Sequence, residues 1–188
     1  MTAEEVFRRV VGALERAGIP YMLTGSFASA FHGVPRATQD IDMVISPTAD
    51  QLRALVRLLP ASEYYVDEDA ALDAHRRQAQ FNVVDFASGW KIDLIIRKSR
   101  PFSRGEFDRR STVDFHGLRL AIATAEDVLV AKLEWAKLAQ SQRQIEDAAG
   151  ILRIRASDLD RAYLHHWVRQ LDLQEQWEAA CRAAAVAA

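Results

Sequence analysis

Two short apolar segments of this sequence carry aspartates where a strand would be expected to bury its side chains, and these segments constrain the fold most. Residues 40–45 (DIDMVI) place Asp40 and Asp42 two positions apart, and residues 91–96 (KIDLII) contain Asp93. Aspartate is a poor strand former and is costly to bury. Side chains two positions apart on a strand point to the same face, so Asp40 and Asp42 would repel each other. We therefore expect a cation to offset this repulsion.

A divalent metal is the cation that this pattern favours. Mg²⁺ commonly takes one or two carboxylates together with phosphate oxygens of a substrate. If Asp93 lies on a neighbouring strand, the three aspartates could serve a two-metal site for displacement at phosphorus, and Asp93 could help to deprotonate an attacking hydroxyl. We expect Mg²⁺, with Mn²⁺ as an alternative, and a purely structural role is the competing interpretation. Asp85 is a rival third carboxylate, but it lies next to the turn at Ser88-Gly89, where we expect it to be exposed.

A candidate phosphate site precedes the first aspartate pair. Gly25 and Ser26 follow a short apolar run that predicts a strand over 21–24, and Ser26 can N-cap a helix that reaches His32. Glycine lets the backbone approach a ligand closely, and a helix N-terminus presents N–H groups and a positive dipole end to phosphate. Arg36 and Thr38, in the loop before Asp40, could contact phosphate or hold the shape of that loop.

The remaining hydrophobic pattern predicts an α/β protein in which strands dominate the first part and helices the last. We expect a mixed α/β core over residues 1–123 and a helical region over 124–188 that packs on the core. Thr124 resembles the start of a capping box, and the tryptophans at 135, 167 and 177 have spacings that suit core packing. Helices are predicted over 3–17, 26–32, 69–77, 142–153, 157–170 and 173–185, with another that begins at Ser46-Pro47, and strands over 21–24, 40–45, 80–86, 91–97 and in a hairpin across 111–122.

Two charged residues in the helical region stand out. Lys132 falls within the apolar stripe of its helix, so it either extends to the surface or meets an anion such as a phosphate or a carboxylate. Asp147 lies opposite the stripe of the next helix, where it could act at the site or pair with Arg143 at i, i+4.

Composition narrows the class of protein. The chain has 188 residues and a formal net charge of −2, which argues against coating a long duplex by bulk electrostatics. The basic segment 97–110 could still contact phosphates or an acceptor, or could be a solvated surface. No apolar run approaches the roughly 18 residues of a membrane span, the N-terminus does not look like a signal peptide, and Cys181 is the single cysteine. We expect a cytoplasmic protein with no membrane partner.

These motifs together resemble a known superfamily. Gly-Ser, a spacer, Asp-x-Asp between apolar residues and a later strand aspartate are similar to the signature of the DNA polymerase β-like nucleotidyltransferases. Several segments also resemble one branch, the abortive-infection type IV toxin-like nucleotidyltransferases, although that branch often has two glycines where this chain has Gly25-Ser26. The segments are RATQDID (36–42), FNVVDFASGWKIDLII (81–96), PFSRGEFDRR (101–110), AEDVLVAKLEWAK (125–137) and RQIEDAAGIL (143–152).

The resemblance implies a mixed-sheet nucleotidyltransferase core, Mg²⁺ dependence and transfer of a nucleoside monophosphate from an NTP with release of pyrophosphate. It implies that Gly25 and Ser26 hold the triphosphate and that Asp40, Asp42 and Asp93 bind metal. Lys132 and Asp147 match a lysine and an aspartate of the toxin branch.

The acceptor stays open between RNA or tRNA, a protein and a small molecule such as an aminoglycoside. The branch favours RNA or another macromolecule and a role as the toxin of a toxin–antitoxin pair, with a cognate antitoxin as partner. The alternative function is a catalytically silent module of the same fold that binds a nucleotide or a partner.

Overall fold

The computed structural model describes residues 3–115 and 117–187, which cluster into two compact units. The sheet unit comprises residues 1–23 and 38–122, and the helical unit comprises 24–37 and 123–188. The segment 24–37, which the sequence pattern placed with the core, groups instead with the C-terminal helices. The residues proposed to act at one site are therefore distributed over two units, and each unit is described by itself below.

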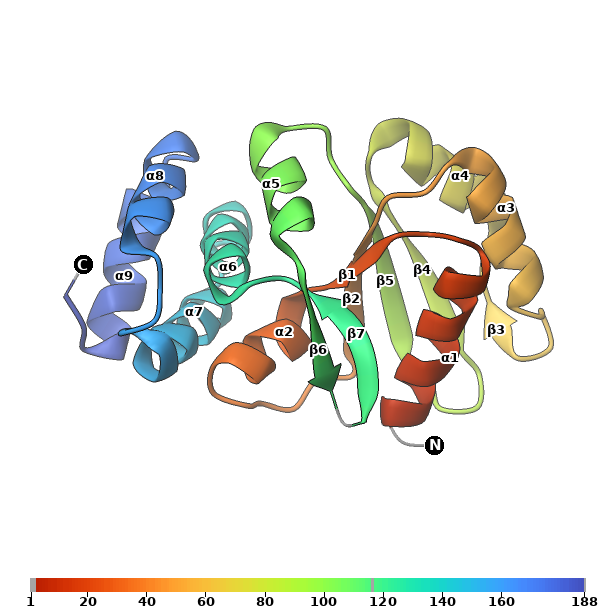
Figure 1. Ribbon diagram of the computed structural model, residues 1–188, viewed down its shortest axis with the longest axis horizontal. Helices are drawn as coiled ribbons and strands as arrows, with labels where there is room; N and C mark the ends of the chain where they lie inside the picture. Colours follow the sequence, from red (N-terminus) through yellow and green to blue (C-terminus); the bar gives the residue numbers. More distant parts are fainter. Residues whose placement is uncertain (1–2, 116, 188) are drawn as a thin grey trace. The chain divides into compact units, whose positions relative to one another are not determined.

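The sheet unit is built on one mixed β-sheet (Figure 1). Its strand order is β3-β4-β5-β2-β1-β7-β6, in which β2 pairs with β5 and β1 with β7 in parallel, while the other pairs are antiparallel. This mixed sheet confirms the predicted fold class. The strands are β1 (Tyr21–Leu23), β2 (Asp40–Ile45), β3 (Tyr64–Tyr65), β4 (Gln80–Asp85), β5 (Lys91–Ile96), β6 (Ser111–Phe115) and β7 (Leu118–Ile122).

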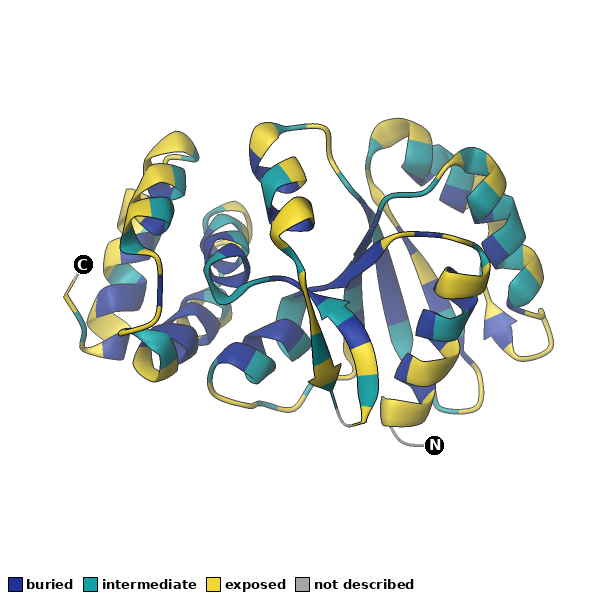
Figure 2. Cartoon of the chain, viewed as in Figure 1, coloured by how far each residue is buried: buried dark blue, intermediate teal, exposed yellow. Residues whose placement is uncertain are grey.

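Alternation along β2 and β5 separates the core from the candidate site. Ile41 and Met43 of β2 and Ile92 and Leu94 of β5 are almost fully buried on one face of the sheet. The intervening positions point to the opposite face, where residues range from buried to exposed (Figure 2). The aspartates of both strands occupy these intervening positions, so their charge is kept out of the apolar core.

The helices of the sheet unit follow from local sequence signals. In α1, Val6, Phe7 and Leu14 form the predicted buried stripe. The start of α3 was predicted wrongly at Ser46-Pro47, because Thr48 caps the helix in a capping box with Gln51. Helix α5, with proline at its first position, and the short β3 were not predicted. The helices are α1 (Ala3–Arg16), α3 (Ala49–Leu58), α4 (Glu68–Arg77) and α5 (Pro101–Arg109). The predicted turn at His116-Gly117 falls partly on residue 116, which lies outside the described residues.

The helical unit packs its helices around α7, which contacts α2, α6 and α9. Thr124 caps α6 as predicted. A Cβ atom at Gly33 would lie 2.7 Å from the backbone nitrogen of Ile151, so the end of α2 can approach α7 only because this residue lacks a side chain. Trp177 is buried as predicted, whereas Trp135 is 52% exposed. The helices are α2 (Gly25–His32), α6 (Ala125–Ala139), α7 (Gln142–Arg155), α8 (Arg161–Gln170) and α9 (Gln174–Ala184). Within the described part of the chain, no helix has both the length and the apolar character needed to cross a bilayer.

His32, at the end of α2, should make the stability of the protein depend on pH. Burial lowers the pKa of His32, the hydrogen bond from its Nε2 to the Ala123 carbonyl oxygen (2.7 Å) opposes this, and the charge of Arg155 adds to the lowering. The lowered pKa keeps the ring neutral to a lower pH in the folded protein than in the unfolded chain, where the ring binds a proton below about pH 6.5. We therefore expect the melting temperature to fall as the pH drops from about 7 to about 5.

The measurement is thermal unfolding followed by circular dichroism across that pH range. His32→Gln should flatten the slope, whereas His75→Gln, in the sheet unit, should keep the slope of the wild type. An unchanged slope in His32→Gln would contradict the assignment.

Candidate active site

The sheet unit gathers four charged side chains on one face at the pairing of β2 with β5. In this parallel register Asp40 lies opposite Lys91 and Asp42 lies opposite Asp93. Paired residues on adjacent strands share a face, so the three predicted aspartates and this lysine point to the same side of the sheet. We call Asp40, Asp42, Lys91 and Asp93 the acidic tetrad. Asn82 of β4 pairs with Asp93 and extends the polar face by one strand.

Lys91 supplies a cation to the tetrad from within the chain. Its Nζ lies 3.0 Å from Oδ2 of Asp93. The hydrogen bond to Asp93 raises the pKa of Lys91, partial burial opposes this, and the charges of Asp93, Asp40 and Asp42 add to the increase. Lys91 was not predicted from the sequence, although the signal was present: Lys-x-Asp in β5 has the same two-residue spacing as Asp-x-Asp in β2. The repulsion that called for a metal is thus relieved in part by an ammonium group.

The tetrad has the donor chemistry for a divalent metal, but its carboxylates do not surround a common point. Among the described residues, no group of three or more carboxylate, imidazole or thiol side chains is placed to hold a metal ion. Asp93 is 7% exposed, and its Oδ1 is buried with no hydrogen-bond partner in the described parts of the chain. That orphaned oxygen, with Asp42 beside it in register, fits Mg²⁺, which needs only one or two carboxylates besides water and substrate phosphates.

Asp85 does not belong to the tetrad. It is 1% exposed, which corrects the expectation of an exposed turn residue. Its Oδ1 accepts hydrogen bonds from the backbone nitrogen and the hydroxyl of Ser88, and Oδ2 lies 3.7 Å from Arg9 of α1. Because Asp85 lies an odd number of residues from Asn82, its side chain points to the other face of the sheet. Its burial is explained by a turn and an ion pair.

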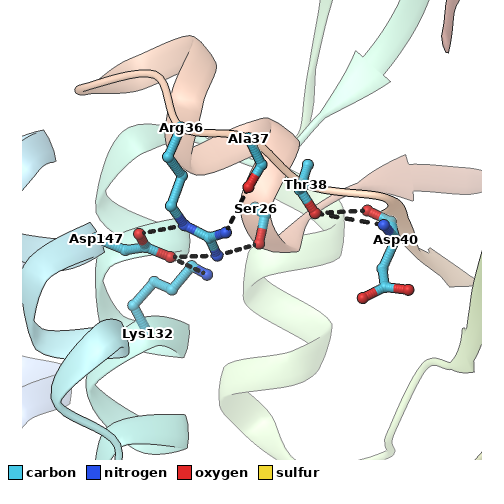
Figure 3. Close-up of polar contacts among 7 residues, drawn as sticks. All are labelled: Ser26, Arg36, Ala37, Thr38, Asp40, Lys132 and Asp147. Carbon is cyan, nitrogen blue, oxygen red and sulfur yellow. Dashed lines mark hydrogen bonds and ion pairs between the residues drawn. The ribbon is translucent and has the colours of Figure 1, made fainter.

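Thr38 organises the start of β2. Its hydroxyl accepts a hydrogen bond from the backbone nitrogen of Asp40 (3.3 Å) and lies 3.4 Å from the carbonyl oxygen of the same residue (Figure 3). Of the two roles expected for Thr38, these contacts support holding the loop in shape. The side chain thereby positions the first residue of the tetrad.

In the helical unit, Gly25 and Ser26 form the first turn of α2. The helix begins at Gly25 with Thr24 as its N-cap, so the prediction that Ser26 caps the helix is wrong. Thr24 makes no side-chain hydrogen bond to the helix end. Gly25 has a φ of 63°, a left-handed value that other residues adopt at a cost. The N–H groups of this first turn therefore have no side-chain cap from Thr24, and N–H groups at a helix N-terminus can bind phosphate.

Arg36, Lys132 and Asp147 form a polar cluster within the helical unit (Figure 3). Arg36 donates from Nε to Asp147 Oδ1 at 2.8 Å and from Nη2 to Oδ2 at 3.1 Å, while Lys132 Nζ donates to Oδ2 at 2.8 Å. Arg36 Nη2 also donates to the Ser26 hydroxyl at 2.6 Å. Lys132 contacts a carboxylate, which was one of the two possibilities predicted for it. Asp147 pairs with Arg36 and Lys132, and not with Arg143 as one interpretation of the sequence had it.

Two cationic side chains bind the carboxylate of Asp147. Burial by itself would raise the pKa of Asp147, but the hydrogen bonds from Arg36 and Lys132 outweigh it and hold that pKa below its usual value. The arrangement also fixes the guanidinium plane of Arg36, which suits recognition of phosphate oxygens.

Comparison with known proteins identifies the fold. The sequence matches no known protein family and no curated protein. Among solved structures, an antigenic nucleotidyltransferase-like protein from Paracoccidioides brasiliensis is 17% identical, with a TM-score of 0.53 over 95% of this chain and 94% of that one. The antibiotic-resistance factor ANT(2'')-Ia, in complex with adenylyl-2''-tobramycin, is 12% identical, with a TM-score of 0.60 over 91% of this chain and 97% of that one.

A solution structure of ANT(2'')-Ia matches this chain comparably, with 13% identity and a TM-score of 0.58 over 93% of this chain and 92% of that one. Identities this low carry no information about substrates, but agreement over nearly the whole of both chains establishes the architecture. The fold that the sequence resemblance predicted is thereby confirmed, while the toxin branch stays a prediction. This chain has the nucleotidyltransferase fold.

Proposed function

We propose that this protein is a metal-dependent nucleotidyltransferase that moves a nucleoside monophosphate from an NTP to an acceptor hydroxyl and releases pyrophosphate. The observation that carries the proposal is the register of β2 and β5, which aligns Asp42 with Asp93 and sets Asp40 on the same face. A sheet that served only as a scaffold would gain nothing from three carboxylates at adjacent positions. Because the chain has the nucleotidyltransferase fold, we interpret this acidic face as the site of nucleotidyl transfer.

Each candidate site residue of the sheet unit has a proposed role. Asp40, Asp42 and Asp93 would hold Mg²⁺, or Mn²⁺ in its place. The bound metal would neutralise phosphate charge and orient the phosphate for in-line attack. Asp93 would also accept a proton from the attacking hydroxyl, and Thr38 would keep Asp40 in position.

The residues of the helical unit would bind the triphosphate. The backbone of Gly25 and the hydroxyl of Ser26 would contact phosphate oxygens at the start of α2. Arg36 and Lys132 would supply positive charge, and Asp147 would hold both cations in place. This division leaves metal binding to one unit and phosphate binding to the other.

The acceptor that we propose is RNA, with tRNA as the first candidate and a protein hydroxyl as the next. Exposed basic residues on and before α5 provide contacts for a phosphate backbone in a chain whose net charge is otherwise negative. ANT(2'')-Ia, in contrast, has been captured with an adenylylated aminoglycoside, so a small-molecule hydroxyl is the acceptor to test against RNA. The exposed basic residues are Lys98, Arg104 and Arg109.

Incubation with each of four α-³²P-labelled NTPs, Mg²⁺ and total cell extract tests this function. We expect label to enter a ribonuclease-sensitive band from one preferred NTP, together with pyrophosphate, and to be lost with EDTA. Label in a protease-sensitive band would replace RNA by protein, and label on an added aminoglycoside would replace it by a small molecule. Stabilisation by NTP without pyrophosphate, across all acceptors, would favour the catalytically silent binding module.

The proposed setting is a cytoplasmic toxin that a cognate antitoxin restrains, which follows the resemblance of the sequence to the toxin branch. The single cysteine, Cys181, is compatible with a reducing compartment. Expression should then arrest growth, and Asp42→Ala should abolish the arrest. Harmless overexpression of the wild type in its native host would remove the toxin role and leave the enzymatic proposal standing.

A further inference from the structure

We propose that Lys91 is an internal counter-ion that competes with the divalent metal for the acidic tetrad. This inference rests on the proposed function, because it assumes that the tetrad binds metal. Lys91 would occupy one cation position in the metal-free protein and would leave Asp93 when the metal binds. The lysine would thus keep the carboxylates together before nucleotide and metal arrive.

The register places this ammonium group among the carboxylates. Lys91 pairs with Asp40 across β2 and β5, and it precedes Asp93 by two positions on its own strand. Its Nζ holds Oδ2 of Asp93 at 3.0 Å, while Oδ1 of that carboxylate is buried without a hydrogen-bond partner among the described residues. Asp93 is therefore half satisfied: one oxygen is bound by the lysine and the other is available to a further cation.

The charge of the tetrad points in the same direction. One ammonium group serves a sheet face that carries three carboxylates. A divalent ion at Asp93 would repel this ammonium group at the same carboxylate, so the metal and Lys91 compete for Asp93.

The side chain of Lys91 is able to leave. It is 40% exposed, whereas the Asp93 side chain is 10% exposed. The lysine stem is flexible and its ammonium group is easily rehydrated, so departure from Asp93 costs little once a metal takes over the carboxylate. A buried lysine such as Lys132, which is 5% exposed, lacks this freedom.

Titration of the protein with Mn²⁺ in the absence of nucleotide tests the competition, with binding followed by the electron paramagnetic resonance signal of free Mn²⁺. Lys91→Met and Lys91→Gln should bind Mn²⁺ about tenfold more tightly than the wild type. Lys91→Arg should stay close to the wild type, because the positive charge remains. Lys137→Met is the matched control, since Lys137 is similarly exposed at 37% and forms an ion pair with Asp172 in the other unit.

Thermal unfolding gives a second readout that a merely structural ion pair would not produce. In EDTA, Lys91→Met should melt below the wild type, because three carboxylates lose their internal cation. Saturating Mg²⁺ should close this gap. A structural ion pair would instead leave the same gap under both conditions.

The outcomes separate this inference from the function on which it rests. Equal Mn²⁺ affinity of Lys91→Met and the wild type, with weaker binding in Asp42→Asn, would overturn the competition and leave the metal site intact. If neither the wild type nor Lys91→Met bound Mn²⁺, the inference and the proposed metal dependence would both fail. Tighter binding in both neutral variants, with Lys137→Met unchanged, would support the competition.

Discussion

Asp42→Asn is expected to lower the rate of nucleotidyl transfer about a thousandfold. Asparagine has nearly the shape of aspartate but no charge, so it would remove one of the carboxylates proposed to hold the metal. Asp42 is half-buried and points to the sheet face opposite the apolar core formed by Ile41 and Met43. The substitution should therefore leave the fold intact. Pyrophosphate release at saturating NTP and Mg²⁺ measures the rate, and circular dichroism checks the fold.

Asp50→Asn is the control for this change. Asp50 lies in the first turn of α3, its side chain is 94% exposed, and it pairs with Arg53 on the same helix. This variant should keep the wild-type rate, because it removes the same charge away from the tetrad. If Asp42→Asn were as active as the wild type, the carboxylates of β2 and β5 would have no catalytic function and the proposed enzyme would have to be abandoned.

Asp147→Ala is expected to reduce the free energy of unfolding by about 3 kcal/mol. The Asp147 side chain is 6% exposed and is the shared partner of Arg36 and Lys132. Its removal leaves the ammonium group of Lys132 buried without a counter-charge, and the cost of an uncompensated buried charge exceeds the worth of an ordinary hydrogen bond. Urea unfolding followed by fluorescence or circular dichroism measures the difference.

The surface ion pair of Asp172 with Lys137 provides a matched control for Asp147→Ala. It has the same 2.8 Å separation, but the Asp172 side chain is 93% exposed. Water therefore solvates both charges when the pair is broken. Asp172→Asn, which suits the left-handed φ of 54° at this residue, should leave stability nearly unchanged. The double variant Asp147→Leu with Lys132→Met should recover much of the stability lost in Asp147→Ala, since both buried charges are removed together. Equal destabilisation by Asp147→Ala and Asp172→Asn would show that burial does not set the loss of stability.

Local pattern accounts for the elements that the sequence predicted correctly. β2 spans residues 40–45 as expected, and the alternation of apolar residues with aspartates marked both the strand and its polar face. The same reasoning identified β5 and its hairpin with β4. The start of α3 was misplaced because Ser46 and Thr48 are both residue types that cap helices, and the capping box with Gln51 forms at Thr48.

By itself, the sequence determined the mixed sheet, the candidate aspartates and the likeness to nucleotidyltransferases, because these depend on spacing along one segment. Only the tertiary structure decided which charges neutralise each other. Arg36 and Asp147 are 111 residues apart, and the position of Asp40 and Asp42 beside Lys91 and Asp93 depends on the parallel register of β2 with β5. A charge pattern shows that a counter-charge is needed, but many residues could supply it. The register of strands and the packing of helices select the partner.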